Sequence, residues 1–175
     1  MIQTWTDPWI PDHPPRPPRP LAHMPTVVPI TPTLGNPEMK RKIWKTKLPL
    51  KLQHFVWKIS SRCIATWANL KRRHISQDAT CLRCGIDDEI EDHLFFECPY
   101  AKRIWRGSCI SNNIINSLTS TLEDKITACL DCCTSSILVH LQDRIIWILW
   151  QIWKSRNILI FQNKQISWKN VIQYA

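Results

Sequence analysis

Three cysteines and one histidine lie close together in the stretch CLRCGIDDEIEDHLFFEC, in the order Cys-x2-Cys-x8-His-x4-Cys. Zn²⁺ prefers thiolate and imidazole ligands in a tetrahedral arrangement, and two cysteines separated by two residues can reach one ion from a tight turn. The glycine directly after the second cysteine lets the backbone turn there with a positive φ. The pattern therefore predicts one zinc ion held by Cys81, Cys84, His93 and Cys98. Buried cysteines beside a solvated histidine are the alternative, which fits a lone Cys-x2-Cys better than four ligands in this order.

The predicted ion has a structural role, because four protein ligands leave no open position for a substrate. Its binding free energy would be on the order of 10 kcal/mol, comparable to the whole stability of a small domain. His93 and Cys98 are more than one helical turn apart in sequence, so the chain must leave helical geometry between them or just after. The acidic residues at 87–92 favour a helix that starts near His93, and they can orient its ring.

A second group of cysteines follows later in the chain. Cys129, Cys132, Cys133 and His140 give the pattern Cys-x2-Cys-Cys-x6-His, with no glycine after the cysteines and an ill-placed fourth ligand. We therefore expect buried or incidental cysteines there, with a second metal site as the open alternative.

The cysteines also bear on the compartment. The N-terminal stretch MIQTWTDPWIPDH has no basic segment followed by an apolar run, so it does not read as a signal peptide. We expect a reducing compartment inside the cell, without a choice between nucleus and cytoplasm. The longest apolar stretch, residues 145–153, is too short to cross a bilayer, so no membrane partner is expected.

The fold class is predicted to be mainly α. Only three glycines occur in 175 residues, which argues against a β-rich fold with many tight turns. Eleven of the thirteen prolines lie in residues 1–37, which predicts a disordered, polyproline-like arm. We expect a zinc-stabilised helical domain at 38–107, a loop or linker at 108–136 and a C-terminal helical segment at 137–175.

Four helices can be placed from the pattern of apolar residues and caps, one of them a short helix with Pro99 at its first position that continues to Trp105. One runs from Pro49 to about Cys63, with an apolar face and a separate stripe of cations. A short helix follows Thr66 as N-cap and runs to Arg73. The last helix, residues 138–161, is apolar almost all round, so it should be buried on more than one side or lack a partner within this chain.

Charge is distributed in blocks along this chain of net charge +9. Residues 39–77 hold eleven Lys or Arg and no acid, with Trp44, Trp57 and Trp67 among them. Cations neutralise phosphates, and exposed indoles can stack on unpaired bases. We therefore predict contact with RNA or DNA through Lys51, Lys58, Arg62, Lys71, Arg72 and Arg73. The alternative is a solvated helix face with the tryptophans in the core.

The metal ligands and their flanks resemble a known family over about 62 residues: the zinc-binding module of plant non-LTR (LINE-type) retroelement reverse transcriptases. The matching features are Trp44-Lys45, Pro49-x-Lys51, Phe55-x-Trp57-Lys58, Arg73, Cys81-x2-Cys84-Gly85, Glu89, His93-Leu94-Phe95, Cys98-Pro99 and Trp105. The segments WTDPWIP and ILWQIWKSRNILIF are similar to the flanks of that module. The resemblance implies a piece derived from a retroelement polyprotein, with a ribonuclease H domain expected beyond Ala175.

No catalytic constellation is apparent. The chain has no phosphate-binding glycine loop, and we find no nucleophile with a base and no polymerase carboxylate pair. We therefore predict a non-enzyme without a small-molecule substrate that contacts RNA or DNA non-specifically. Two alternatives remain: a module that docks onto a polymerase or ribonuclease H domain through the last helix, and a decayed fragment without a present role.

Overall fold

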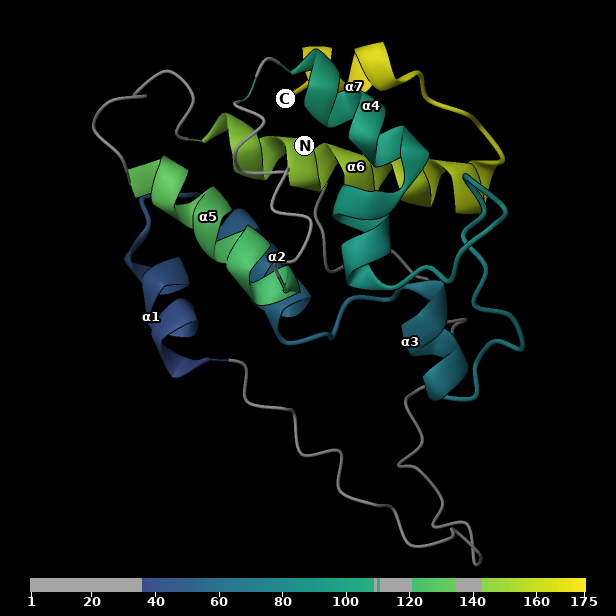
Figure 1. The fold of residues 1–175 in the computed structure, drawn as a ribbon, viewed down its shortest axis with the longest axis horizontal. Coiled ribbons are helices and arrows are strands. Elements are labelled where there is room, and N and C mark those ends of the chain that lie inside the picture. The colour runs from purple at the N-terminus through teal and green to yellow at the C-terminus, as the bar shows by residue number, and fades with distance from the viewer. Residues whose placement is uncertain (1–35, 109, 111–120, 135–142) are drawn as a thin grey trace, which may run out of the picture. The chain divides into compact units, whose positions relative to one another are not determined.

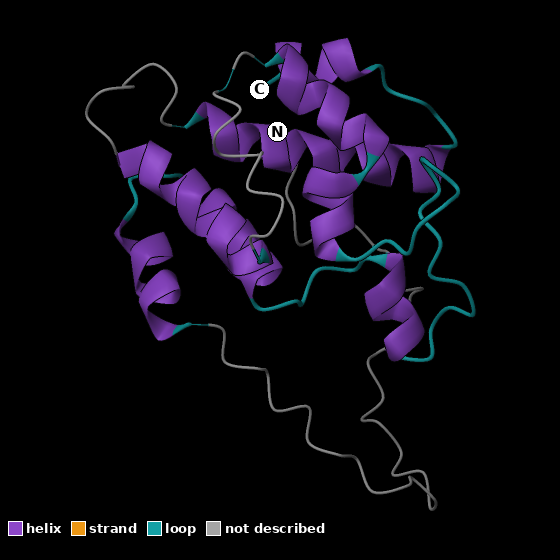
Figure 2. Cartoon of the chain, viewed as in Figure 1, coloured by secondary structure: helices purple, strands orange, loops and turns teal. Residues whose placement is uncertain are grey.

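The computed structural model describes residues 36–108, 110, 121–134 and 143–175. Residues 1–35, which make up nearly all of the predicted proline-rich arm, lie outside this range, so the arm stays a prediction. The described elements are α1 (Pro37–Lys45), α2 (Leu50–Ser60), α3 (Trp67–Arg72), the π-helical turn η1 (His93–Glu97), α4 (Pro99–Gly107), α5 (Leu122–Thr134), α6 (Arg144–Gln162) and α7 (Trp168–Gln173). The described part contains no strand, only one isolated β-bridge between Thr80 and Asp88 (Figure 2). The predicted α class is confirmed.

The helix starts follow local sequence chemistry. Asn36 caps α1 by accepting a hydrogen bond from the Glu38 amide, and a proline opens both α1 and α4. Thr66 caps α3 by accepting from the Asn69 amide, as predicted. The predicted helix from Pro49 is confirmed as α2, although it ends at Ser60, three residues earlier than expected.

The expected loop at 108–136 is wrong for residues 122–134, which form α5. Its start carries a reciprocal cap: the Thr121 amide donates to the Asp124 carboxylate, and the Asp124 amide donates to the Thr121 hydroxyl. Its buried residues recur at helical spacing, at Leu122, Ile126, Cys129 and Leu130. This spacing is visible in the sequence, but the polar residues that precede α5 led to the prediction of a loop.

The C-terminal segment also differs from the expectation. The last long helix is described from Arg144, six residues after its predicted start, and residues 138–142 lie outside the described range. It ends at Gln162, where Asn163 adopts the left-handed conformation that often closes helices. A further short helix, α7, was not predicted; the Ser167 side chain caps it.

Helix α6 is the centre of the packing. It contacts α2, α5, α7 and η1, while α1 packs on α2 and α5, and α4 packs on α7 and η1 (Figure 1). Its apolar side chains are buried, which confirms the expectation of burial on more than one side: Ile145, Ile146, Ile148, Leu149 and Ile152. The core runs from Met39 to Val171, and the described residues, which begin at 36, all belong to one compact unit. The predicted boundary at 107 therefore does not divide the core.

Candidate metal centre

The four predicted ligands come together. The Sγ atoms of Cys81, Cys84 and Cys98 and a ring nitrogen of His93 all lie within 4.8 Å of one another. His93 Nε2 is 3.3 Å from Cys84 Sγ. In a tetrahedral zinc site with ordinary bond lengths, neighbouring S and N donors are about 3.6 Å apart and neighbouring S atoms about 3.8 Å. The donor set therefore fits one zinc ion.

A tight turn presents the first two cysteines. The Gly85 amide donates to the Cys81 carbonyl at 2.8 Å, and Gly85 has a φ of +69°, as the sequence predicted. The Cys81 amide in turn donates to the Asp87 carbonyl, which closes the loop behind the sulfurs. A side chain at position 85 would be strained in this conformation, although it would meet no neighbouring atom.

The π-helical turn η1 presents the other two ligands. The Cys98 amide donates to the His93 carbonyl, five residues back, at 2.7 Å. In an α-helix, residues five apart point about 140° away from each other. The wider turn brings both side chains toward one point, so the expected departure from α-helical geometry is confirmed.

The far side of the histidine ring faces a carboxylate. Asp87 Oδ2 lies 3.5 Å from His93 Nδ1, opposite the nitrogen that faces Cys84. Such a carboxylate fixes the orientation of the ring and makes the facing nitrogen a better ligand. The expected role of the acidic loop in orienting the histidine is consistent with this contact.

The thiols differ in acidity. A hydrogen bond from Cys81, together with the amides of Tyr100 and Ala101, lowers the pKa of the Cys98 thiol. The same bond and burial raise the pKa of the Cys81 thiol. Cys98 is therefore the more readily ionised of the pair, and a metal must displace the proton that Cys81 donates.

Aromatic residues fix the metal motif in the core. Phe95 and Phe96 are buried, and the Trp105 indole donates to the Phe95 carbonyl at 2.7 Å. Phe96 stacks on Trp105, and Phe55 of α2 meets Phe95 edge to face. The metal motif thus packs against α2 and α4, and all three belong to one hydrophobic core.

A buried ion pair joins the metal loop to α6. The Glu89 carboxylate is 1% exposed and accepts from Arg156 Nε at 3.0 Å and from the Trp67 amide at 3.1 Å. The Arg156 guanidinium lies over the rings of both Trp67 and Trp153. The sequence pointed to Glu89 as one of the acidic residues before His93 and as part of the resemblance, but it did not point to Arg156. No sequence pattern singled out Arg156, because Lys154, Ser155 and Asn157 beside it make this stretch of α6 polar.

A second charged cluster joins the motif to α5. Lys125 is buried, and its Nζ donates to Asp92 and to Glu97 at 2.8 Å each. The amine lowers the pKa of the Glu97 carboxyl. No sequence pattern pointed to this lysine, because its partners lie about thirty residues earlier.

The six residues predicted to contact nucleic acid are all exposed. Lys51 and Lys58 lie on one face of α2, Arg62 follows that helix, and the remaining three lie at the end of α3: Lys71, Arg72 and Arg73. The three tryptophans differ. Trp44 is 49% exposed and Trp57 is half-buried, whereas the half-buried Trp67 packs against Arg156 and its indole nitrogen is buried without a partner.

The second cysteine group forms no candidate metal site in the part of the chain that the structure describes. Cys129 is a core residue, and Cys132 and Cys133 are half-buried. Burial raises the pKa of Cys133 to about 12, which favours the protonated thiol over a metal ligand. His140 lies outside the described residues. The group Cys81, Cys84, His93 and Cys98 is the only candidate metal cluster among the described residues.

Known proteins match the same region. Residues 30–105 match a family model described as zinc-binding in reverse transcriptase, and all four metal ligands lie within the match. This segment is therefore similar to the zinc-binding domains of reverse transcriptases, and its four clustered ligands fit the one zinc ion that this similarity implies. The match confirms the resemblance seen in the sequence.

One curated relative agrees with a retroelement origin. An Arabidopsis thaliana protein, provisionally named a ribonuclease H protein, is 27% identical over 124 residues, which is 66% of this chain and 19% of that protein. The chain thus spans about a fifth of the relative's length. No solved structure matches the chain. None of the described helices is long and apolar enough to span a bilayer.

Proposed function

We propose that this chain is a non-catalytic zinc module that contacts RNA or DNA non-specifically through its basic helices. The observation that carries the proposal is the acid-free block at 39–77, whose predicted contact residues are all exposed while its apolar residues enter the core. An ordinary solvated face mixes charges of both signs. A single-signed face is suited to phosphates, because binding releases their counterions.

The proposed interface is clearest on α2. Lys51 and Lys58 lie on its exposed side with His54 between them, and the His54 ring stacks on Trp57 at 5.8 Å between centroids. Lys40 of α1 lies 5.9 Å from the same indole. Cations beside partly exposed aromatic rings suit a single-stranded nucleic acid, because the cations can pair with its phosphates and the rings can stack on its bases.

The non-catalytic part of the proposal rests on the metal centre. Four protein ligands would complete the tetrahedron that zinc prefers, so no position would remain for a water molecule or a substrate. A zinc ion bound by these residues would fix the metal loop, and the loop's Glu89 pairs with Arg156 of α6 on the other side. None of the seven cysteines among the described residues forms a disulfide, which suits a reducing compartment.

The docking alternative relied on the wide apolar surface of the last helix. In the described structure Ile145, Ile146, Ile148, Leu149 and Ile152 are buried against neighbouring helices, whereas Trp147, Trp150 and Trp153 are half-buried and Phe161 is 80% exposed. The helix therefore offers a partner domain less apolar area than its sequence indicates.

The test is a salt titration of single-stranded RNA binding with Lys51→Glu/Lys58→Glu. Removal of two phosphate contacts should weaken binding and lower the slope of log K against log salt by about 1 to 2. The matched control is Arg144→Glu/Lys154→Glu on α6, which makes the same change in net charge. Equal loss in both variants, or a slope near zero for the unchanged chain, would show that the α2 face is not the interface.

A further inference from the structure

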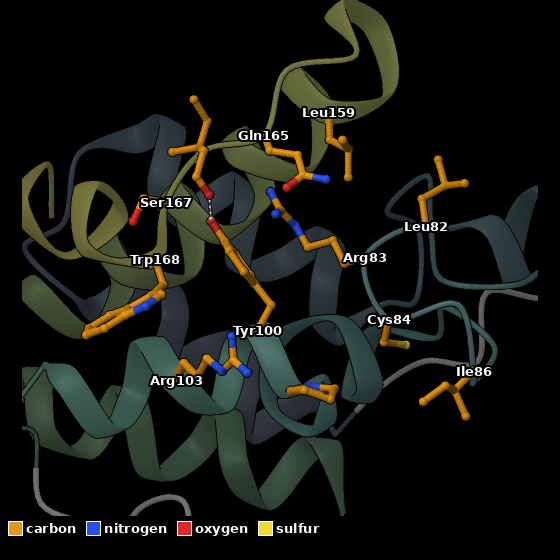
Figure 3. A pocket seen from close by; sticks show the side chains of 12 residues that line it. Leu82, Arg83, Cys84, Ile86, Tyr100, Arg103, Leu159, Gln165, Ser167 and Trp168 are labelled. Carbon is orange, nitrogen blue, oxygen red and sulfur yellow. Dashed lines mark hydrogen bonds between the residues drawn. The ribbon is translucent and has the colours of Figure 1, made fainter.

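A cleft of about 440 Å³ lies beside the metal centre. Four segments form its walls: the metal loop, the start of α4, Leu159 of α6, and residues 165–168 that lead into α7 (Figure 3). The candidate zinc ligand Cys84 lies on one wall, so an ion bound there would help to fix this part of the cleft. None of the lining residues is an acid, and two are arginines, Arg83 and Arg103.

Arg83 lies in an unusual environment. Its guanidinium stacks on the Tyr100 ring with the central carbon 3.7 Å from the ring centroid (Figure 3). Its Nε and Nη2 atoms are buried and have no hydrogen-bond partner. A guanidinium normally pairs with carboxylates or carbonyls when it is withdrawn from water, so an unpaired one needs an explanation. The lining contains no carboxylate to pair with this charge, and the nearest negative charge in the zinc-loaded chain would be the single net charge of the three thiolates and the ion.

Arg103 and Trp168 supply the accessible groups. Arg103 is exposed and has no ion pair with any described residue. Trp168 is half-buried at the cleft and also lines a neighbouring hollow with Arg103 and Arg106. Lys169 lies 5.7 Å from its ring centroid. The segments that carry these residues, 99–122 and 144–175, contain no acid, a feature that sequence reasoning overlooked.

We propose that this cleft binds one nucleotide of a single-stranded nucleic acid, with the phosphate on Arg103 in the field of Arg83 and the base against Trp168. The ligand class rests on the proposed function, but the site is separate from the α2 face. Arginine matches the geometry of phosphate oxygens, and an indole stacks on any base. Gln165 and Ser167 on the same wall offer polar groups within the cleft.

The test uses the zinc-loaded full chain and a fluorescein-labelled oligothymidylate of about eight nucleotides, a length within the usual range of single-strand sites. Arg103→Gln should lower the salt slope by about 1, because one phosphate contact is lost. Trp168→Leu should weaken binding about tenfold with the salt slope unchanged, because stacking releases no counterions. Lys102→Gln is the matched control: it lies next to Arg103 on α4, but its amine pairs with Glu97.

Each result decides the matter. If Arg103→Gln binds the oligonucleotide like Lys102→Gln, the proposed nucleotide site in the cleft is wrong. If only Lys51→Glu/Lys58→Glu then loses binding, the proposed function through the α2 face stands. A loss seen only with the cleft variants upholds the cleft and removes the α2 face instead. Equal binding of polyglutamate, unaffected by Trp168→Leu, would assign the cleft to acidic peptides and overturn the proposal. Zinc content and circular dichroism accompany every variant, and Arg103 is exposed, so its replacement keeps the test independent of folding.

Discussion

At the scale of single residues, the metal centre depends on one irregular turn. His93 and Cys98 are five residues apart, and only the π-helical turn directs both side chains to one ion. Asp87 then orients the histidine ring from the opposite side. Each of these residues positions a ligand atom toward one point, so replacing a single ligand should impair zinc binding by the whole site.

Cys84→Ser should abolish stoichiometric zinc binding, because a hydroxyl is a poor substitute for a thiolate ligand. Metal analysis of the purified chain should give about one zinc per unchanged molecule and well below one for the variant. Since metal binding contributes on the order of 10 kcal/mol to folding, the variant should also lose most of its cooperative thermal transition.

Cys63→Ser is the control for the loss of a thiol. Cys63 lies outside the metal cluster and donates only to the Ser61 carbonyl, which a hydroxyl can also do. This variant should keep its zinc. Full zinc content in Cys84→Ser would rule out the assigned ligand set.

At the scale of elements, charged side chains connect helices that are far apart in the sequence. Arg156 of α6 holds Glu89 of the metal loop, and Lys125 of α5 holds Asp92 and Glu97. The first pair is almost fully buried, whereas Glu97 is 42% exposed in its side chain, so solvent weakens the second cluster. The Glu89–Arg156 pair is therefore the more critical of the two connections.

Arg156→Met should destabilise the fold by about 3–5 kcal/mol, because it leaves the buried Glu89 carboxylate without its partner. Urea unfolding of the zinc-loaded chain measures this change. Lys154→Met on the same helix is exposed and should cost less than about 0.5 kcal/mol. Similar losses for the two variants would mean that Arg156 contributes packing area alone.

At the scale of the whole molecule, one hydrophobic core includes residues from α1 to α7. The metal motif, with its buried Phe95 and Phe96, packs within this core. Gly107 permits close approach of α4 to α7, since a Cβ there would lie 2.6 Å from the Trp168 ring. The described unit should therefore fold as one piece.

Unfolding in urea should show a single transition, with far-ultraviolet circular dichroism and tryptophan fluorescence changing together. Excess EDTA should remove the entire transition, because the ion stabilises the core that every helix shares. Two separate transitions, with α5 to α7 unfolding independently after chelation, would show that the metal motif and the C-terminal helices are distinct domains.

Local features of the sequence were read with most success. Thr66 and Pro99 marked helix starts because caps act within a few residues. The apolar stripe of α2 was visible for the same reason, and its residues Leu52, Phe55, Val56 and Ile59 are buried. The failures were α5, whose cap and spacing were present but unread, and α7, whose six residues are too few to show a period.

The amino-acid sequence alone determined the zinc ligands, the α class and the block of basic residues, because spacing, glycine content and charge depend only on chain order. Only the tertiary structure decided the partners of Glu89, the burial of Lys125, the covering of α6 and the cleft at Arg83. Those contacts join residues that are distant along the chain. Their formation depends on how the shared core closes around the metal motif, which no local pattern specifies.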